Sequence, residues 1–503
     1  SQLRACRRYN TITFPDLHHK NNGDFHLIYD LVITDGLIIN GETEFQGDIA
    51  ISGEKIVAIG TDLTGKTSID ATGKFVLPGA IDSHVHMQTE RKDFCYDDDF
   101  RTGSVAAAFG GVTTIIDQVQ AEHGLTLDAE LSTRMALAAG NSCVDFAFHM
   151  NIREPLEERL KEIPKIVDRG ITSFKWFMSI PGWRVPDEFL LRGMFEVSAL
   201  GGITVIHAEN QGVILEMRRR AAARNARDIV NFNRNYPAAA EASAISLALS
   251  MAEITDGRAL IFHNTCSEGV AAIRAAKERG VQAHGEACLA WLTHTDDIYK
   301  GDQVKALPFL LTPPIRDAGH QSALWRALEL GDLDIISTDH AAMRMVPEEK
   351  AREVAAYFGH DVIAPPVDDT TPFDADGNRL MPVLPPGNVE TRFPLIYSEG
   401  VLKGRLSRAR WVETCCAAPA KLFDLKTKGQ LAPGFDADIV IFDPKARHSY
   451  SVNNLHSNTD YSVWEDWKVQ GKVDKTFSRG KLIVDGDAFL GSAEHGQYLK
   501  RTV

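Results

Sequence analysis

Two histidines separated by one residue, His84 and His86, follow the apolar run Phe75–Ile81. Alternate residues of a β-strand point to the same side, so both imidazoles can reach one cation. The spacing alone is weak evidence, because a His-x-His pattern often arises by chance. Its place at the end of a predicted strand strengthens the case for a metal site.

Residues that can bind metal also end several other apolar runs. They are Lys175 in Ser173-Phe174-Lys175-Trp176-Phe177, His207 after Val205-Ile206, His263 after Ile261-Phe262, and Asp339 after Ser337-Thr338. Taken singly, each is better explained as a hydrogen-bonded polar residue at a strand end. Together they predict a metal centre, because the carboxyl ends of barrel strands meet on one face.

Lys175 lies in an apolar run, where loss of water favours the neutral amine. A neutral amine can take up carbon dioxide as a carbamate, which is an oxygen ligand able to bridge two metal ions. Paired metals about 3.5–4 Å apart polarise a carbonyl and lower the pKa of the water they share. Asp339, close to that water, could act as the general base and then pass the proton to a leaving nitrogen.

The elements that must position these residues alternate between β-rich and helical runs from about residue 76 to about residue 430. The candidate strands are Phe75–Ile81, Val112–Ile116, Val144–Phe148, Ile171–Phe177, Ile203–Ile206, Ala259–Phe262, Val281–Ala283 and Leu333–Ser337. Alternation of this kind is typical of a parallel sheet in an α/β protein. Eight such units predict a TIM (β/α)8 barrel.

The two ends of the chain are instead rich in short strands with Gly, Asn and Asp turns. We predict a smaller β-sandwich domain from residues 27–75 and 433–485, flanking a barrel at 76–432. Periodicity alone does not show that the two halves meet. Residues 1–26 form a polar extension, 486–503 a C-terminal tail, and 341–386 a long connection of the kind that serves as a lid or is disordered.

Composition excludes several classes of function. The chain has 54 Lys and Arg against 68 Asp and Glu, a net charge of -14, which disfavours nucleic acid and anionic membranes as partners. No apolar run approaches the roughly 18 residues of a membrane helix, and residues 1–20 lack the apolar region of a secretory signal. The seven scattered cysteines favour reduced thiols over a disulfide framework. We therefore expect a cytoplasmic protein.

Over nearly its whole length the sequence resembles the amidohydrolase superfamily, and within it the dihydropyrimidinase and hydantoinase group of cyclic amidases. The segments that carry the resemblance are Leu31-Val32-Ile33, Gly53, Ile56-Val57, Pro78-Gly79-Ala80-Ile81-Asp82, Gly110-Gly111-Val112-Thr113-Thr114, His207-Ala208-Glu209-Asn210, Thr312-Pro313-Pro314-Ile315-Arg316, Ser337-Thr338-Asp339-His340, Ala417-Ala418-Pro419-Ala420-Lys421, Ala432-Pro433-Gly434-Phe435-Asp436-Ala437-Asp438, Ser478-Arg479-Gly480-Lys481 and Leu499-Lys500-Arg501.

The resemblance implies a role for each candidate ligand. His84, His86 and Asp339 would hold one metal, His207 and His263 the other, and carboxylated Lys175 would bridge both. Enzymes of this group open cyclic ureides and imides by attack of a metal-bridging hydroxide on a ring carbonyl, usually with zinc and commonly as homotetramers. The expectation is two divalent ions, zinc first among them, a small cyclic amide as substrate, and a homotetramer.

The substrate side departs from the family pattern. Five residues after the bridging lysine the family typically has a tyrosine that stabilises the oxyanion, and here that residue is Ile180. Loss of such a donor typically costs about 10²- to 10³-fold in rate. Backbone groups at Thr312 and at Gly387-Asn388 are expected to bind the substrate, although the second pair reverses the family's Asn-Gly order, which alters the allowed backbone angles.

Several functions remain open at this point. The first is ring opening of a dihydropyrimidine or hydantoin, and the missing tyrosine with the altered loops supports an allantoinase-like or imidase-like preference instead. A non-catalytic scaffold, such as the collapsin response mediator proteins of the same fold, is disfavoured because every ligand position is filled. A mononuclear deaminase is disfavoured by Lys175, since such enzymes typically lack the bridging lysine.

Overall fold

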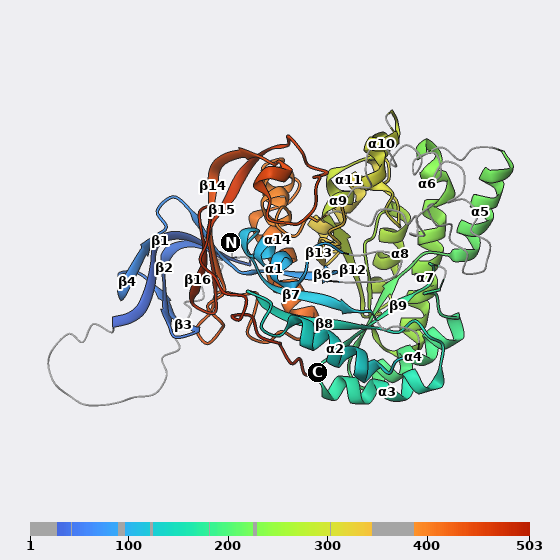
Figure 1. Ribbon diagram of the computed structural model, residues 1–503, viewed down its shortest axis with the longest axis horizontal. Helices are drawn as coiled ribbons and strands as arrows, with labels where there is room; N and C mark the ends of the chain where they lie inside the picture. Colours follow the sequence, from blue (N-terminus) through green and yellow to red (C-terminus); the bar gives the residue numbers. More distant parts are fainter. Residues whose placement is uncertain are drawn as a thin grey trace, which may run out of the picture.

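The computed structural model describes residues 28–41, 43–88, 96–120, 124–180, 182–224, 229–301, 303–344 and 387–503. Within these residues the strands form two sheets, which lie side by side in Figure 1. One is an eight-stranded parallel sheet built from the middle of the chain, and the other is a mixed sheet built from both ends. The predicted extension 1–26 and most of the connection 341–386 lie outside the described residues.

The parallel sheet is the predicted barrel. Its strands follow the order of the sequence, namely β6 (Ala80–Val85), β7 (Val112–Val119), β8 (Asp145–Asn151), β9 (Ser173–Phe177), β10 (Ile203–His207), β11 (Arg258–Ile261), β12 (Ala283–Cys288) and β13 (Ile335–Ser337). The sheet closes between its first and last strands, where Val85 bridges His340 and the His86 N–H donates to the His340 carbonyl at 2.7 Å. The barrel and the α/β class are confirmed.

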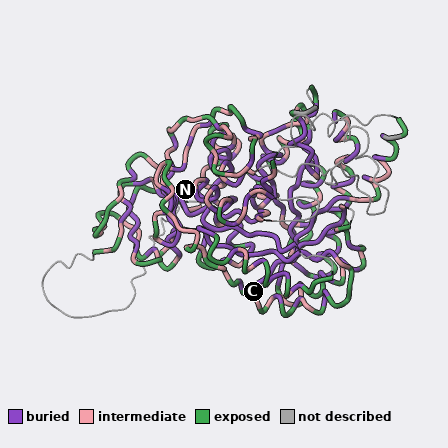
Figure 2. Tube along the Cα trace, viewed as in Figure 1, coloured by how far each residue is buried: buried purple, intermediate pink, exposed green. Residues whose placement is uncertain are grey.

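The barrel interior is filled by apolar side chains from alternate strand positions. They form one cluster that includes Ile81, Ile116, Ala147, Val205, Leu260 and Ile335. Figure 2 shows the buried trace running along the barrel strands. This cluster fills the lower part of the barrel. The polar residues at the carboxyl ends of the strands therefore lie directly above an apolar layer.

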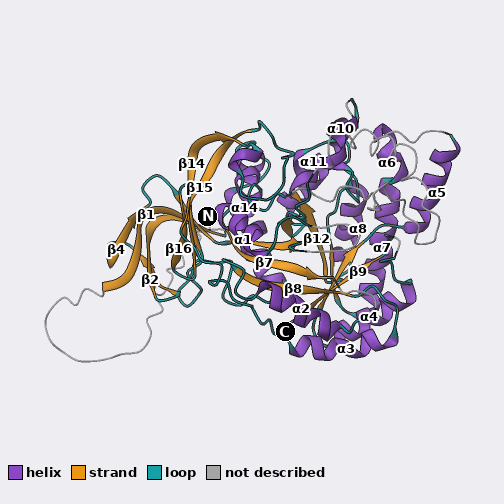
Figure 3. Cartoon of the chain, viewed as in Figure 1, coloured by secondary structure: helices purple, strands orange, loops and turns teal. Residues whose placement is uncertain are grey.

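Helices lie outside the barrel strands (Figure 3). The α-helices are α1 (Phe100–Phe109), α2 (Leu127–Ala138), α3 (Glu157–Asp168), α4 (Asp187–Ala199), α5 (Gln211–Ala223), α6 (Phe232–Asn235), α7 (Ala238–Thr255), α8 (Ser267–Glu278), α9 (Leu289–Thr293), α10 (Gln303–Ala306), α11 (Ala318–Leu330), α13 (Arg392–Leu395), α14 (Arg408–Val412) and α15 (Ala418–Leu422). The 3₁₀ helices are η1 (Ile229–Asn231), η2 (Asp296–Tyr299), η3 (Leu307–Phe309) and η6 (Val452–Asn454), and the π-helices are η4 (Ile396–Val401) and η5 (Glu413–Ala417).

Helix α11 shows how the sequence sets these boundaries. The Asp317 side chain accepts hydrogen bonds from the backbone N–H groups of Gly319 and His320, which satisfies donors that the first turn leaves unpaired. Gly331 ends the helix with φ +84°, a left-handed conformation that suits glycine. The chain then turns directly into β13, which brings Asp339 to the barrel mouth.

The mixed sheet joins the two ends of the chain. Its strands are β1 (Ile28–Asn40), β2 (Thr43–Ser52), β3 (Lys55–Gly60), β4 (Thr64–Asp70), β5 (Phe75–Pro78), β14 (Ile439–Ser449), β15 (Lys468–Ser478), β16 (Lys481–Asp485) and β17 (Ala488–Phe489). Strand β5 connects the halves, since Phe75 pairs with Leu37 of β1 and with Phe442 of β14. A second sheet from both chain ends is thus confirmed, whereas the predicted domain bounds stay a prediction.

The predicted strand Phe75–Ile81 is wrong as a single barrel strand. The structure divides it at Gly79, so that Phe75–Pro78 belongs to the mixed sheet and Ala80–Val85 to the barrel. A Cβ at Gly79 would lie 2.1 Å from the Thr113 hydroxyl oxygen, so only glycine fits at this crossing. The strand predicted at Val281–Ala283 is also misplaced, since β12 runs on to Cys288.

The C-terminal residues return to the barrel. The backbone of Phe146 in β8 donates to Gln497 and accepts from Leu499, and the Arg501 N–H donates to Gly170. None of the helices in the described ranges is long and apolar enough to cross a membrane. The cysteines among the described residues, Cys143, Cys266, Cys288, Cys415 and Cys416, are buried free thiols.

Candidate metal centre

Three of the predicted ligands meet at the seam where β13 closes on β6. His84 lies in β6, His86 directly follows it, and Asp339 follows β13. The Nε2 atoms of both histidines lie 3.0 Å from Asp339 Oδ1. Nitrogen and carboxylate atoms that converge in this way can hold one divalent cation.

The other two predicted histidine ligands lie beside this group at the barrel mouth. His207 ends β10 and His263 follows β11, and His207 Nδ1 lies 3.0 Å from His263 Nε2. Both side chains are buried. The His263 ring centroid lies 5.7 Å from that of His84, so the two histidine groups are neighbours in one site.

Lys175 projects from β9 into the same region. Its Nζ atom is buried, makes no hydrogen bond to the described residues and lies 3.9 Å from the centroid of the Phe262 ring. Burial lowers the pKa of Lys175 to about 7, against the opposing pull of the Glu286 and Asp339 carboxylates. An ammonium held dry and unpaired is unfavourable, so this environment suits the neutral amine or an amine converted into an anion.

Two of the predicted ligands have an uncommon backbone conformation. His263 has φ +35° and Asp339 has φ +56°, which for side chains with a Cβ is strained. Residues held in this way are concentrated at functional sites, where the surrounding structure compensates for the strain.

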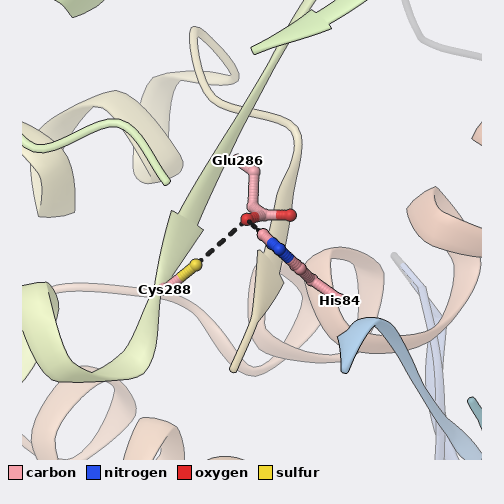
Figure 4. Close-up of side chains that lie close together, drawn as sticks. All are labelled: His84, Glu286 and Cys288. Atoms are coloured by element: carbon pink, nitrogen blue, oxygen red, sulfur yellow. Dashed lines mark hydrogen bonds and ion pairs between the residues drawn. The ribbon is translucent and has the colours of Figure 1, made fainter. Parts of the chain in front are cut away.

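A carboxylate that the sequence did not single out lies behind this site. Glu286 in β12 is fully buried, and its Oε1 atom accepts hydrogen bonds from His84 Nδ1 at 2.9 Å, the His263 backbone N–H at 3.1 Å and Cys288 Sγ at 3.0 Å. Figure 4 shows the side chains of His84 and Cys288 on either side of the Glu286 carboxylate. The sequence offered one signal, an acidic residue within the run Ala283–Cys288. It was missed because the predicted strand ended at Ala283, the first residue of that run.

Charges within the site are strongly coupled. Burial disfavours protonation of His84, yet Asp339 and Glu286 outweigh it and raise the pKa of His84 to about 9. Burial lowers the pKa of His86 and holds that of His263 well below its usual range. Burial alone would raise the pKa of the Asp339 carboxyl. The neighbouring His84 and His86 side chains have the larger effect and keep this pKa well below its usual value.

The predicted substrate-binding residues lie at the edge of this site. The Thr312 hydroxyl donates to Glu209 Oε2 at 2.8 Å, and the same carboxylate oxygen lies 2.9 Å from His207 Nε2. The Asn388 N–H donates to His340 Nδ1 at 2.9 Å, and its carbonyl accepts from Thr391.

Both main-chain groups of Asn388 thus already have protein partners. Gly387 is half-buried, and a Cβ there would lie 2.4 Å from the Ser457 hydroxyl oxygen. Substrate binding by Thr312, Gly387 and Asn388 stays a prediction.

The donor set fits a pair of divalent cations. Two groups of donor atoms, each with members 3.0 Å apart, lie at the same barrel mouth as the buried Lys175 nitrogen, which makes no hydrogen bond to the described residues. Imidazole and carboxylate suit zinc and similar ions. Without a cation, buried atoms such as Lys175 Nζ and His263 Nδ1 remain unsatisfied, which is costly in a folded protein.

Comparison with known proteins gives the class of this site. The model of the amidohydrolase family matches residues 75–483, so the chain belongs to that family. It is 33% identical to D-hydantoinase of Streptomyces coelicolor over 93% of this chain and 97% of the relative. It is 34% identical to D-hydantoinase of Rhizobium radiobacter, over 94% and 99%. The crystal structure of dihydropyrimidinase from Brevibacillus agri superposes with a TM-score of 0.85 at 31% identity, over 94% and 98%.

Proposed function

We propose that this protein is a metal-dependent hydrolase that opens the ring of a cyclic amide, either a dihydropyrimidine, a hydantoin or a related ureide or imide. The observation that carries the proposal is the convergence of six donor residues at one barrel mouth. The similarity to D-hydantoinases and to a dihydropyrimidinase along nearly the whole chain supports the substrate class.

The protein's residues would hold two divalent cations, with zinc as the expected metal. His84, His86 and Asp339 would hold one, and His207 with His263 the other. When bound, such a pair polarises a carbonyl and lowers the pKa of a water molecule.

Lys175 would complete the site as a carbamate. Its neutral Nζ attacks the carbon of carbon dioxide, a C–N bond forms and one proton is released, which leaves an anionic oxygen ligand in place of a buried cation. Burial of the Lys175 Nζ atom, which makes no hydrogen bond to the described residues and lies 3.9 Å from the centroid of the Phe262 ring, supports this role.

Asp339 is the proposed general base. Its Oδ1 atom lies 3.0 Å from two histidine nitrogens, so the carboxylate is held in one orientation at the site. It would accept a proton as the oxygen of water bonds to the ring carbonyl carbon, and it would return that proton to the ring nitrogen as the C–N bond breaks. The ring then opens into a neutral nitrogen that carries the transferred proton and a carboxylic acid, which releases its remaining proton to the solvent.

Ile180 offers no hydroxyl to stabilise the developing oxyanion. It lies in the loop between β9 and α4, where φ is +74°. A substrate preference different from that of typical hydantoinases is therefore part of the proposal, and allantoin and succinimide belong in the assay. A homotetramer is the expected assembly, supported by the family resemblance. Buried free thiols support a reducing compartment such as the cytoplasm.

The test combines metal content with turnover. Protein purified without chelator should contain two metal ions per chain and should open at least one of dihydrouracil, hydantoin, allantoin and succinimide. Lys175→Ala should lose metal and lower turnover by at least roughly 100-fold. Lys165→Ala is the matched control, because Lys165 is an exposed residue of α3 paired with Asp128. Wild-type rates in Lys175→Ala would contradict the binuclear site.

A further inference from the structure

Strand β8, the neighbour of the strand that carries Lys175, ends with an asparagine whose side chain points into the barrel. Ala147 of β8 belongs to the apolar cluster in the barrel interior. Phe148, the next residue, packs edge-on against Phe100 of α1 outside the barrel. Because alternate residues of a strand share a face, Asn151 lies on the inward face with Ala147.

Asn151 and Lys175 enter the barrel side by side. They are paired in the parallel ladder between β8 and β9, and the Ile152 N–H donates to the Lys175 carbonyl at 2.9 Å. Trp176, the next residue of β9, packs edge-on against Phe189 of α4 outside the barrel, so Lys175 points inward. Paired strands lie about 4.7–4.9 Å apart, which makes the two side chains immediate neighbours on the inner face.

Neither of these two side chains is satisfied by the protein. Both amide atoms of Asn151 and the Nζ atom of Lys175 are buried and make no hydrogen bond to the described residues. A lysine ammonium could donate to the amide oxygen of Asn151, yet the two neighbours make no such bond. Unpaired buried amides are costly and indicate that a further polar group is received between them and the rest of the site.

We infer that Asn151 is a positioning residue for the carboxylated form of Lys175, and that its amide N–H donates to a carbamate oxygen. Carboxylation replaces a donor by an anion with two acceptor oxygens, which is the kind of partner that the buried N–H group lacks. Hydrogen bonds to an ionised acceptor are the strong ones, and burial strengthens them further. This inference rests on the proposed function, because it requires the carbamate.

The hydrogen bond has a consequence that can be measured. It stabilises the carboxylated lysine over the free amine, so Asn151 raises the affinity of Lys175 for carbon dioxide. Since the carbamate is a proposed metal ligand, less carbon dioxide is then needed for the protein to take up its metal ions.

Gln118 of β7 offers a matched comparison. Both of its amide atoms are also buried and make no hydrogen bond within the described part of the chain. It is paired with His149, however, which lies two residues before Asn151 and one strand away from Lys175. Loss of the Gln118 amide should therefore change the polarity of the barrel interior to the same extent and leave the carbamate without effect.

The experiment measures how much bicarbonate, as the source of carbon dioxide, the full-length protein needs in order to take up zinc. Protein stripped with a chelator in bicarbonate-free buffer receives buffered Zn²⁺ and a series of bicarbonate concentrations, and bound zinc is counted by elemental analysis after gel filtration. In Asn151→Leu the bicarbonate midpoint should rise by about 10- to 100-fold, the range expected of a hydrogen bond to a charged group. High bicarbonate should restore its full zinc content. Gln118→Met should keep the wild-type midpoint.

The bicarbonate dependence separates a positioning role from a structural one. A merely structural role would lower the zinc content of Asn151→Leu at every bicarbonate concentration. That result, an unchanged midpoint, or an equal shift in Gln118→Met would overturn the inference and leave ring opening intact. If Asn151→Leu does not fold, Asn151→Ala carries the same expectation with a smaller side chain.

The wild-type protein and Lys175→Ala test the function on which the inference rests. Zinc uptake by the wild type should depend on bicarbonate, and residual uptake by Lys175→Ala should not. Wild-type uptake that ignores bicarbonate would remove the carbamate from the proposed function and the inference with it.

Discussion

Glu286 fixes the orientation of His84. Its Oε1 atom accepts the Nδ1–H of His84, which leaves Nε2 of the same ring directed at Asp339. Carboxylates that hold a metal-binding histidine in this way typically contribute 10- to 100-fold to metal affinity. We therefore expect Glu286→Gln to weaken Zn²⁺ binding by about 10- to 100-fold in competition with a chelator.

Cys288→Ser is the matched control for this change. Serine keeps a donor near Glu286 Oε1, where the thiol lies 3.0 Å away, so the carboxylate should stay in place. Zinc affinity in this control should remain within about threefold of wild type. Equal affinity in Glu286→Gln and wild type would show that the carboxylate does not position His84.

At the residue scale, a site residue could be predicted from the sequence only where the end of its strand could be located. All six candidate ligands, His263 included, were predicted at strand ends, and the structure places them at one barrel mouth, although their binding of metal stays a prediction. Glu286 was missed because β12 was predicted to end at Ala283. The β-rich composition that marks the other strands gives way there to small and polar residues, and only tertiary packing extends the strand.

At the scale of elements, a buried histidine connects the end of α9 to the segment before β15. His294 lies between the rings of Phe309 and Trp467, and its Nε2–H donates to the Val463 carbonyl at 3.1 Å. Burial lowers the pKa of His294 to about 4 from an ordinary value near 6.5. Between these two values the unfolded chain binds a proton that the folded protein excludes, so stability is lost as the pH falls.

We therefore expect acid to destabilise the wild-type protein more than His294→Gln, in which an amide N–H can still reach Val463. Between pH 7.5 and pH 5 the extra loss in the free energy of unfolding should be about 2 kcal/mol. Thermal midpoints at the two pH values measure it. Parallel pH profiles for the two proteins would mean that the pKa of His294 is not lowered in the folded state.

The elements also show where local patterns fail. The run Phe75–Ile81 is apolar throughout, so periodicity offers no sign that it serves two sheets. The break at Gly79 depends on the closeness of Thr113, a residue of the next strand. The joining of β5 to β14 likewise pairs residues more than 360 positions apart, which no local pattern encodes.

At the scale of the whole molecule, a buried cluster of charges joins the mixed sheet to the barrel. Lys428 Nζ lies 2.6 Å from Asp145 at the start of β8 and 2.7 Å from Asp438 just before β14. Arg479, which follows β15, also pairs with Asp145, and its N–H donates to Asp438 at 2.7 Å. Opposite charges therefore balance one another where the two sheets meet.

Removal of one cation from this cluster should destabilise the junction severely. In Lys428→Met the carboxylates of Asp145 and Asp438 stay buried with less compensation, a change that typically costs about 3–5 kcal/mol. Lys472→Met is the matched control, because its partner Asp487 is 91% exposed and such surface pairs contribute about 0–1 kcal/mol. Thermal unfolding followed by near-ultraviolet circular dichroism should show a much larger loss for Lys428→Met, and adding Asp438→Asn should restore part of it. Equal midpoints in the two lysine variants would mean that the cluster does not hold the sheets together.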